Sequence, residues 1–469
     1  MSQPSANRHN HARLTEGSVS GHLAAMSIPM IWGILAVISI NVTDTFFVGQ
    51  LGTEPLAALA FTFPVVMTVM SLALGLGIGV GSVLARQMAT ASDARLRRLT
   101  TDSLVLALLI VIGFVVVGLL TIDPLFAALG AGPDMRERIA DYMVIWYLGM
   151  PFLVVPMVGN NVIRACGDAR LPSMLMVWAA IANIGLDPIL IFGLGPVPAM
   201  GLEGAALASA LARASSLLLT LAVLHYRMHL IEWAWPQWAH LKASARAVLH
   251  VALPAAATNM VNPISIAVVT ALVAPFGAPA VAGFGVATRI ESLAMIPILA
   301  LTAGIAPVVG QNWGADRTER VARVLAVAAG FCVVWGLAMA ALLALFGAQL
   351  ASVFDSQPET VEAAALYLWI VPISFAGYGL LICVNAMLNA AGRPLSATTL
   401  SLTRAFGLYV PLAWIGSLVF GLWAVFAAAS VSSVLAAVFA WWRGRRLVRI
   451  AAPRGDRDGD ELVESVGPH

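Results

Sequence analysis

Two carboxyl groups lie inside otherwise apolar stretches, and they are the side chains of this chain best suited to chemistry. Asp44 lies in NVTDTFFVGQLGT and Asp187 lies in MVWAAIANIGLDPILIFGLG. Asn183 precedes Asp187 by four residues, so the two side chains share one face of a helix. An acid within a membrane span usually marks an ion path or a proton relay. We therefore predict that Asp44, Asn183 and Asp187 bind a proton or a cation.

The residue types leave the identity of the bound ion open. Burial and like charge both favour the protonated form of a carboxyl group, so at least one acid is expected to bind protons near neutral pH. An oxygen-rich site also suits Na⁺. Pro188 directly follows Asp187 and weakens the local backbone ladder, which frees a carbonyl for coordination. Pro29, upstream of Asp44, offers a kink point in the same span. If that span ended early, Asp44 would instead be an interfacial residue.

Other polar residues within apolar stretches are weaker candidates for a cavity or coupling role. Tyr142 begins a span, where an interfacial aromatic residue is the ordinary alternative. Ser209 in GAALASALA is either a ligand or a small residue that allows helices to pack closely. Asn160 is a further candidate because it recurs later in the chain as Asn385.

The composition indicates that these residues lie in a membrane protein. Hydrophobic residues make up 60% of the 469-residue chain and charged residues only 11%, with a mean hydropathy of +0.89. A soluble domain has roughly 25% charged residues. The net charge of +2 is too small to suggest a nucleic-acid partner. The first 20 residues are polar and show no signal peptide, and the three cysteines fit neither a metal site nor a disulfide framework.

The apolar runs predict an all-α polytopic protein with twelve spans, because a span needs about 20 mainly apolar residues. The predicted spans are 23–48, 55–84, 101–122, 139–163, 171–194, 202–224, 250–274, 280–310, 324–347, 363–388, 395–418 and 421–442. Between the sixth and seventh spans, residues 225–249 contain Trp233, Trp235 and Trp238 beside basic residues, which is typical of a connector on the membrane surface.

The distribution of Lys and Arg predicts the orientation. Both tails and the loops after even-numbered spans carry 21 of the 26 Lys and Arg, while the loops on the other side carry Arg136 and Arg138. Basic residues are retained on the cytoplasmic side. Both termini are therefore expected to be cytoplasmic.

The chain also repeats itself with a constant offset. Pro29 and Pro254, Gly79 and Gly304, Asn160 and Asn385 are identical pairs separated by 225 residues. Each repeat holds six spans, so both enter the membrane in the same direction, as in transporters whose halves are related by an axis along the membrane normal. Asp44 corresponds to Val269 in the second repeat. The fold therefore does not require the acid, which is expected to serve the first half alone.

These features predict the following division of the chain: an N-terminal tail (1–22), an N-lobe (23–224), a connector (225–249), a C-lobe (250–442) and a C-terminal tail (443–469). The two lobes are expected to be pseudo-symmetric, with a central cavity between them. The tails and the connector are expected to be cytoplasmic.

Five segments resemble the signature of the multidrug and toxic compound extrusion (MATE) family. They are NVTDTFFVGQLGTEPLAALAFTFP, IRACGDARLP, NIGLDPILIFGLG, GLEGAALASALA and PVVGQNWGA. The similarity extends from about Ile28 to Arg446. It implies two six-helix lobes in a bacterial cytoplasmic (inner) membrane. It also implies export of lipophilic, often cationic compounds driven by H⁺ or Na⁺ entry, with antibiotic resistance as an associated role.

Within this family the chain looks like the DinF-like branch, whose site uses an aspartate in helix 1 and an Asn-x-x-x-Asp pair in helix 5. Asp44, Asn183 and Asp187 occupy those positions, and Pro29 and Tyr142 match the kink proline and the helix 4 tyrosine of the branch. The helix 6 hydroxyl is a serine in this chain where family members often have threonine, which puts a Na⁺ ligand role in doubt. The NorM-like branch has acids in helices 7 and 10 that this chain lacks.

The function that we predict is proton-coupled antiport, with a Na⁺-coupled antiporter and a flippase for a lipid-linked saccharide as alternatives. A flippase would need several cationic residues in its cavity, and only Arg213, Arg289 and Arg404 lie within spans. Glu291 is expected either to clamp Arg404 or to take part in gating. An intramembrane enzyme and a channel are disfavoured by the absence of catalytic and filter motifs. No cofactor, metal or nucleic acid is expected, and the protein is expected to function as a monomer.

Overall fold

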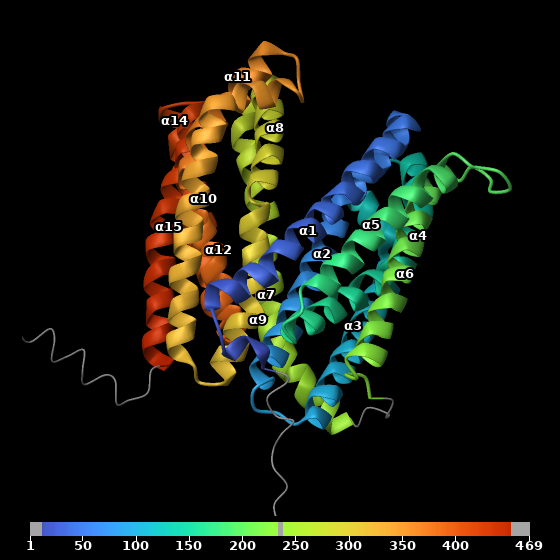
Figure 1. Cartoon of the computed structure of the whole chain (residues 1–469). Coiled ribbons are helices and arrows are strands. Elements are labelled where there is room, and N and C mark those ends of the chain that lie inside the picture. Colours follow the sequence, from blue (N-terminus) through green and yellow to red (C-terminus); the bar gives the residue numbers. More distant parts are fainter. Residues whose placement is uncertain (1–11, 233–237, 452–469) are drawn as a thin grey trace, which may run out of the picture. The chain divides into compact units, whose positions relative to one another are not determined.

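The computed structural model describes residues 12–232 and 238–451, and within these ranges every regular element is helical (Figure 1). The first half contains α1 (Val19–Gln50), α2 (Thr53–Gln87), α3 (Asp93–Ala128), α4 (Pro133–Ala165), α5 (Arg170–Ile191) and α6 (Gly201–Ala222). The second half contains α7 (Trp238–Val273), α8 (Ala278–Ala294), α9 (Ile296–Gly314), α10 (Thr318–Ser352), α11 (Pro358–Ile370), α12 (Phe375–Ala390), α13 (Pro394–Leu402), α14 (Val410–Val419) and α15 (Leu422–Ala451).

The described helices include twelve that are long and apolar enough to cross a membrane. Large apolar side chains are exposed on them, for example Leu120 (77%), Leu218 (69%) and Val438 (65%). Such exposure is favourable only when the surrounding solvent is itself apolar. The chain is therefore an all-α multi-pass membrane protein, as its hydropathy predicts.

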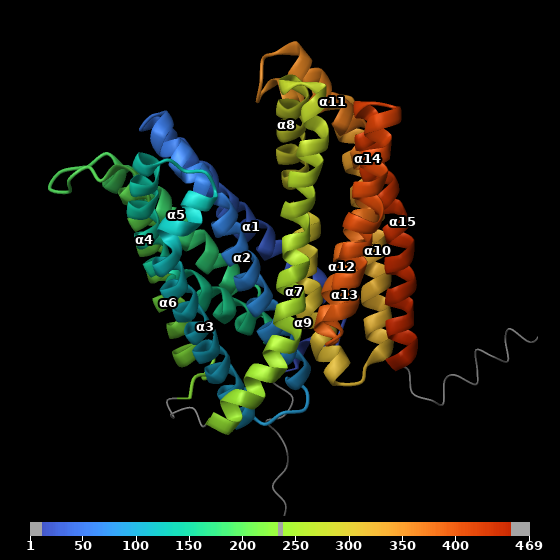
Figure 2. The ribbon, with the colours of Figure 1, turned by 180° about the vertical axis from the view of Figure 1, so that it is seen from behind.

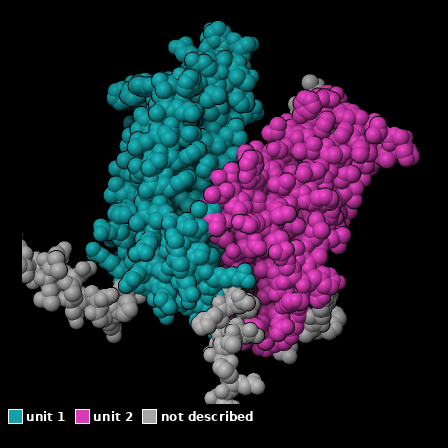
Figure 3. Space-filling view, in the orientation of Figure 1, with its two compact units in different colours: residues 1–24, 88–90, 261–469 teal, residues 25–87, 91–260 magenta. Residues whose placement is uncertain are grey.

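The protein divides into two compact units (Figure 3). One unit comprises residues 25–87 and 91–260, and the other comprises residues 1–24, 88–90 and 261–469. The boundary between them falls within α7, after Met260. α1 also changes unit, after Ala24.

The same packing pattern recurs inside each unit. α4 packs against α2, α3 and α6 in the first, and α12 packs against α9, α10 and α15 in the second. These partners correspond under the 225-residue offset, since α10 begins at Thr318 and α3 at Asp93. The structure thus has two pseudo-symmetric lobes of six spans each, as the repeat predicts.

Prolines interrupt three spans of the second half that the sequence predicts to be continuous. The predicted span 280–310 is two helices, α8 and α9, because Pro297 lacks the N–H that would bond to the carbonyl four residues earlier. The predicted span 363–388 is interrupted at Val371–Ser374, which contains Pro372. The predicted span 395–418 contains a π-helical turn, Thr403–Tyr409, just before Pro411. Figure 2 labels α13 and α14, the helices on either side of this turn.

Several predicted boundaries also differ from the structure. α1 begins at Val19, inside the predicted tail, and α15 continues to Ala451, nine residues past the predicted end of the last span. Polar residues extend these helices because a helix does not need to end where the apolar run ends. Trp238 begins α7, so residues 238–249 are helical rather than a separate connector, and Trp233 and Trp235 lie outside the described residues.

Candidate functional site

Three helices of the first unit bring the predicted site residues together. α1 carries Asp44, α5 carries Asn183 and Asp187, and α6 carries Ser209. The amide of Asn183 donates to Asp187 Oδ1 at 3.2 Å and to Ser209 Oγ at 3.3 Å. The hydroxyl of Ser209 then donates to Asp44 Oδ2 at 3.4 Å. The bonds form one continuous chain, in which the hydroxyl of Ser209 connects the two carboxyl residues through Asn183.

The site is withdrawn from the lipid-facing surface. Asp187 is fully buried, Asn183 is 1% exposed and Ser209 is 6% exposed, while Asp44 is half-buried. Three buried oxygens have no hydrogen-bond partner among the described residues: Asp44 Oδ1, Asn183 Oδ1 and Asp187 Oδ2. Buried acceptors without a donor are costly. Oxygens of this kind are suited to bind a proton or a cation.

The two carboxyl groups also interact with each other. The charge of Asp44 acts on Asp187. Two negative charges in a buried site repel each other, and a proton or a cation bound between them relieves that repulsion. The geometry is therefore suited to hold a proton or a cation between α1 and α5.

Arg213 is a member of the site that the sequence analysis did not identify. Its charge interacts with Asp44 and with Tyr142. A sequence signal was present, because Arg213 follows Ser209 by four residues and so shares its face of α6.

Tyr142 and Asn160 occupy different environments on α4. Tyr142 lies near enough to Asp44, Asp187 and Arg213 to interact electrostatically with all three. Asn160 has a buried Oδ1 without a hydrogen-bond partner among the described residues, and no described hydrogen bond joins its side chain to Asp44. The structure thus brings Tyr142 to the site and leaves Asn160 outside the hydrogen-bonded chain.

Pro29 lies within α1, which remains helical on both sides of it. Its carbonyl accepts a hydrogen bond from the hydroxyl of Ser173 on α5. Gly33 allows the close approach, since a Cβ there would lie 3.2 Å from Ser173 Cα. The predicted kink point is therefore also the place where α1 is fastened to α5, the helix that carries Asp187.

The second half lacks an equivalent site. At the 225-residue offset, the positions of Asp44, Asn183, Asp187, Ser209 and Arg213 are occupied by Val269, Leu408, Leu412, Val434 and Val438. All five polar positions are therefore aliphatic in the second half, as expected if these residues serve the first half alone.

The second unit has a different polar cluster, around Glu291. This carboxylate accepts a hydrogen bond from the hydroxyl of Tyr367. Arg404 does not form a described ion pair with it, although their charges interact. The guanidinium of Arg404 instead lies 4.2 Å from the ring centroid of Tyr378 and donates to Ser433 Oγ at 3.2 Å. The expected clamp between Glu291 and Arg404 is therefore indirect.

Comparison with known proteins identifies the class of protein that has this fold. The MatE family model matches twice, over residues 29–189 and 254–415, and the two matches begin 225 residues apart. The chain belongs to this family, the MATE transporters, which are transporters rather than enzymes. The double match also confirms the internal repeat.

Particular relatives cover nearly the whole chain. It is 36% identical over 425 residues to the FAD transporter of Shewanella oneidensis. This alignment covers 91% of this chain and 94% of the relative. It is 23% identical to the multidrug export protein MepA of Staphylococcus haemolyticus, over 90% of this chain and 93% of the relative. A crystal structure of the Vibrio cholerae MATE transporter VcmN superposes with a TM-score of 0.88 at 29% identity, over 92% of this chain and 97% of VcmN.

Proposed function

We propose that this protein is a proton-coupled exporter in which Asp44 and Asp187 form the coupling site. The observation that carries the proposal is the bonded chain from Asp44 through Ser209 and Asn183 to Asp187. When Arg213 is charged and one of the two carboxyl groups is protonated, Asp44, Asp187 and Arg213 together carry no net charge. Loss of that proton would leave a net negative charge in an apolar region, which is unfavourable.

Coupling requires that proton and substrate prefer different states of the same protein. In the outward-open state, a proton binds to the Asp44–Asp187 pair and alters the hydrogen bonds that fasten α1 to α5 and α6. α1 then bends near Pro29, where the helix already lacks one backbone donor. The affinity for substrate falls, the substrate leaves, and the inward-open state releases the proton. The two ligands act on one equilibrium, so each reduces the affinity for the other.

Protons suit this site better than Na⁺ because of Arg213. A fixed cation next to Asp44 reduces the attraction of the site for a second permanent cation. The helix 6 hydroxyl also donates to Asp44 and so does not direct a lone pair toward that carboxylate. Na⁺ coupling remains the alternative.

The substrate class has two candidates. Family members such as MepA are named as multidrug exporters, which supports export of lipophilic or cationic compounds. The relative with 36% identity is named an FAD transporter, which supports export of an anionic flavin dinucleotide. The flippase alternative requires a cationic cavity, and Arg213 already interacts with Asp44 and Tyr142.

We propose that the protein lies in a bacterial inner membrane with both termini in the cytoplasm and acts as a monomer. This orientation follows from the side on which 21 of the 26 Lys and Arg lie.

The test is transport in proteoliposomes with an imposed pH gradient or, separately, a Na⁺ gradient. Ethidium and FAD are compared as substrates for wild type, Asp44→Asn and Asp187→Asn, with Asp141→Asn as a matched control because Asp141 is an exposed acid on α4. We expect pH-driven export to fall at least tenfold in both site variants and to stay unchanged in the control. Full export by both site variants would refute the coupling site. Export driven by a Na⁺ gradient alone would identify Na⁺, and not H⁺, as the coupling ion.

A further inference from the structure

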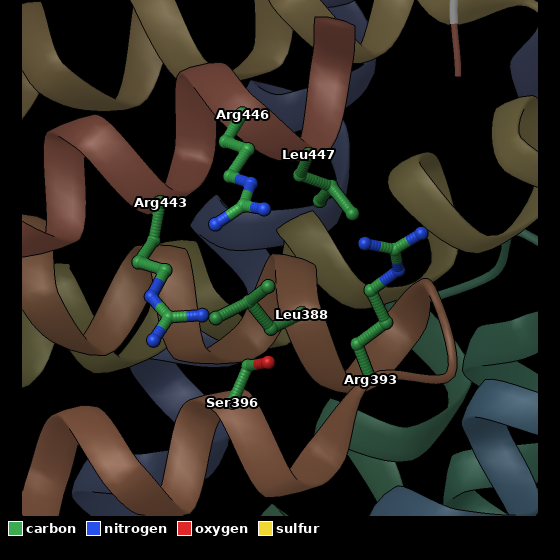
Figure 4. Close-up of a pocket in the computed structure, with 6 residues that line it drawn as sticks. All are labelled: Leu388, Arg393, Ser396, Arg443, Arg446 and Leu447. Carbon is green, nitrogen blue, oxygen red and sulfur yellow. The ribbon is translucent and has the colours of Figure 1, made fainter. Parts of the chain in front are cut away.

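A cavity of about 190 Å³ lies in the second unit, where the end of α12, the start of α13 and the C-terminal part of α15 meet (Figure 4). We call it the arginine pocket. It is lined by Leu388, Arg393, Ser396, Arg443, Arg446 and Leu447. In Figure 4 the side chains of Arg443 and Arg446 extend from α15 toward Leu388, and Arg393 lies on the opposite side of Leu388 and Ser396.

The charge of the arginine pocket is unbalanced. Three of its six lining residues are arginines and none is acidic. The ion pairs formed by the described residues do not include Arg393, Arg443 or Arg446. Like charges gathered in one cavity repel each other, and a bound anion relieves that repulsion. Guanidinium groups match the paired oxygens of a phosphate with two parallel hydrogen bonds.

The internal repeat allows the start of α13, beside the arginine pocket, to be compared with the equivalent helix start in the first half. In both halves a left-handed glycine ends a helix: Gly167 (φ +87°) after α4 and Gly392 (φ +75°) after α12. The residue that follows is Asp168 in the first half and Arg393 in the second, and each donates its N–H to the carbonyl five residues earlier. The two positions are structurally equivalent.

Their side chains have opposite effects on the next helix. Asp168 accepts hydrogen bonds from the N–H groups of Arg170 (2.9 Å) and Leu171 (3.1 Å), and so neutralises the start of α5 with its own negative charge. Arg393 is a cation and cannot accept, and no side chain of the described residues caps α13. The second half thus lacks the internal anion of the first half and places three arginines around the same helix start.

Aromatic residues place the arginine pocket at the membrane–water interface. Trp441 and Trp442 of α15 are 37% and 53% exposed, beside the arginines at the end of this span. The guanidinium groups of Arg443 and Arg446 lie 5.6 Å and 5.4 Å from the ring centroid of Trp442. Tryptophan next to arginine is typical of the headgroup region.

We propose that the arginine pocket binds a phosphate group, and that its source is the headgroup of an anionic phospholipid such as phosphatidylglycerol. The three arginines and the start of α13 would hold the phosphate, while Leu388 and Leu447 contact the glycerol carbons. The bound lipid would connect α15 to the start of α13 through its phosphate. In the first half, the carboxylate of Asp168 accepts from the N–H groups at the start of α5. The site is separate from the coupling residues of the first unit.

Lipid binding to the purified full-length protein is measured by native mass spectrometry, with phosphatidylglycerol, phosphatidylethanolamine and inorganic phosphate as separate probes. We expect wild type to prefer phosphatidylglycerol, and Arg393→Gln and Arg443→Gln each to weaken that binding about fivefold. Arg445→Gln is the matched control, because Arg445 lies over Trp441 and does not line the pocket. Arg393→Lys, which keeps the charge but loses the paired donors, should weaken binding less than Arg393→Gln.

Four results would overturn the proposal. The first two are a loss of binding in Arg445→Gln equal to that in the pocket variants, and binding of phosphatidylethanolamine equal to that of phosphatidylglycerol. If inorganic phosphate saturated the arginines and phosphatidylglycerol did not bind, free phosphate would be the ligand. If phosphatidylglycerol bound only after deletion of the acidic segment 452–469, that segment would be the occupant.

Discussion

The hydroxyl of Ser209 donates to Asp44 Oδ2, although 165 residues separate the two in the chain. The same hydroxyl accepts from the amide of Asn183, so it connects α1 to α5 through α6. A change in the protonation of Asp44 therefore alters hydrogen bonds on two neighbouring helices. Ser209 is a connecting residue of the site and not only a small residue at a helix contact.

Ser209→Ala tests this connection. Removal of the hydroxyl leaves the amide of Asn183 and the carboxyl of Asp44 without their shared partner, which should destabilise the protein by about 1–3 kcal/mol. We expect gradient-driven export to fall and the melting temperature in detergent to drop, while Ser209→Thr retains both. The control is Ser216→Ala, another buried serine of α6. Equal effects of the two alanine variants would show that Ser209 acts only through packing.

Arg213→Gln tests the role of the fixed charge. Without this cation, the negative charge on Asp44 loses a stabilising neighbour, and the protonated form becomes more favourable. The proton should then be released less readily, so the pH dependence of export should shift to higher pH. The measurement is the initial rate of export against internal pH, for wild type, Arg213→Lys and Arg213→Gln. An unchanged profile in Arg213→Gln would show that this charge does not act on the coupling site.

Gly204→Ala tests the contact between α5 and α6 that sets the register of Asn183 against Ser209. A Cβ at Gly204 would lie 2.6 Å from the carbonyl carbon of Leu190 and 2.9 Å from the nitrogen of Ile191. These are backbone atoms, so the helices must separate, at a cost of about 1–3 kcal/mol. We expect a lower melting temperature and weaker export.

The matched control for this variant is Gly185→Ala, also in the first unit. A Cβ at Gly185 meets no atom within 4 Å, so the alanine should be neutral or slightly stabilising in the helix. If both variants had the same stability as wild type, the close approach at Gly204 would not constrain the site.

Tyr367→Phe tests whether the Glu291 cluster of the second unit is structural. The variant removes the hydroxyl that donates to Glu291 and leaves a buried acceptor without its donor, which should cost about 1–3 kcal/mol. Thermal unfolding should occur at a lower temperature, while the dependence of export on the pH gradient should match wild type. Loss of pH-driven export in a folded Tyr367→Phe protein would instead assign a coupling role to the second half.

Much of the protein follows from local features of the sequence. The apolar runs determine twelve spans because each span must cross a hydrocarbon layer of fixed thickness. The four-residue spacing of Asn183 and Asp187 places them on one helix face whatever the surrounding structure. The 225-residue repeat establishes that there are two lobes. Val269 stands at the repeat position that corresponds to Asp44, which shows which lobe holds the acids.

The tertiary structure alone decided which of these faces meet. Spacing along a helix does not fix how that helix is rotated against its neighbours, and side-chain packing determines the rotation. Packing therefore brought Ser209 and Arg213 to Asp44 and left Asn160 outside the bonded chain. The structure also shows which prolines interrupt a span, since α1 continues through Pro29 while α8 ends before Pro297.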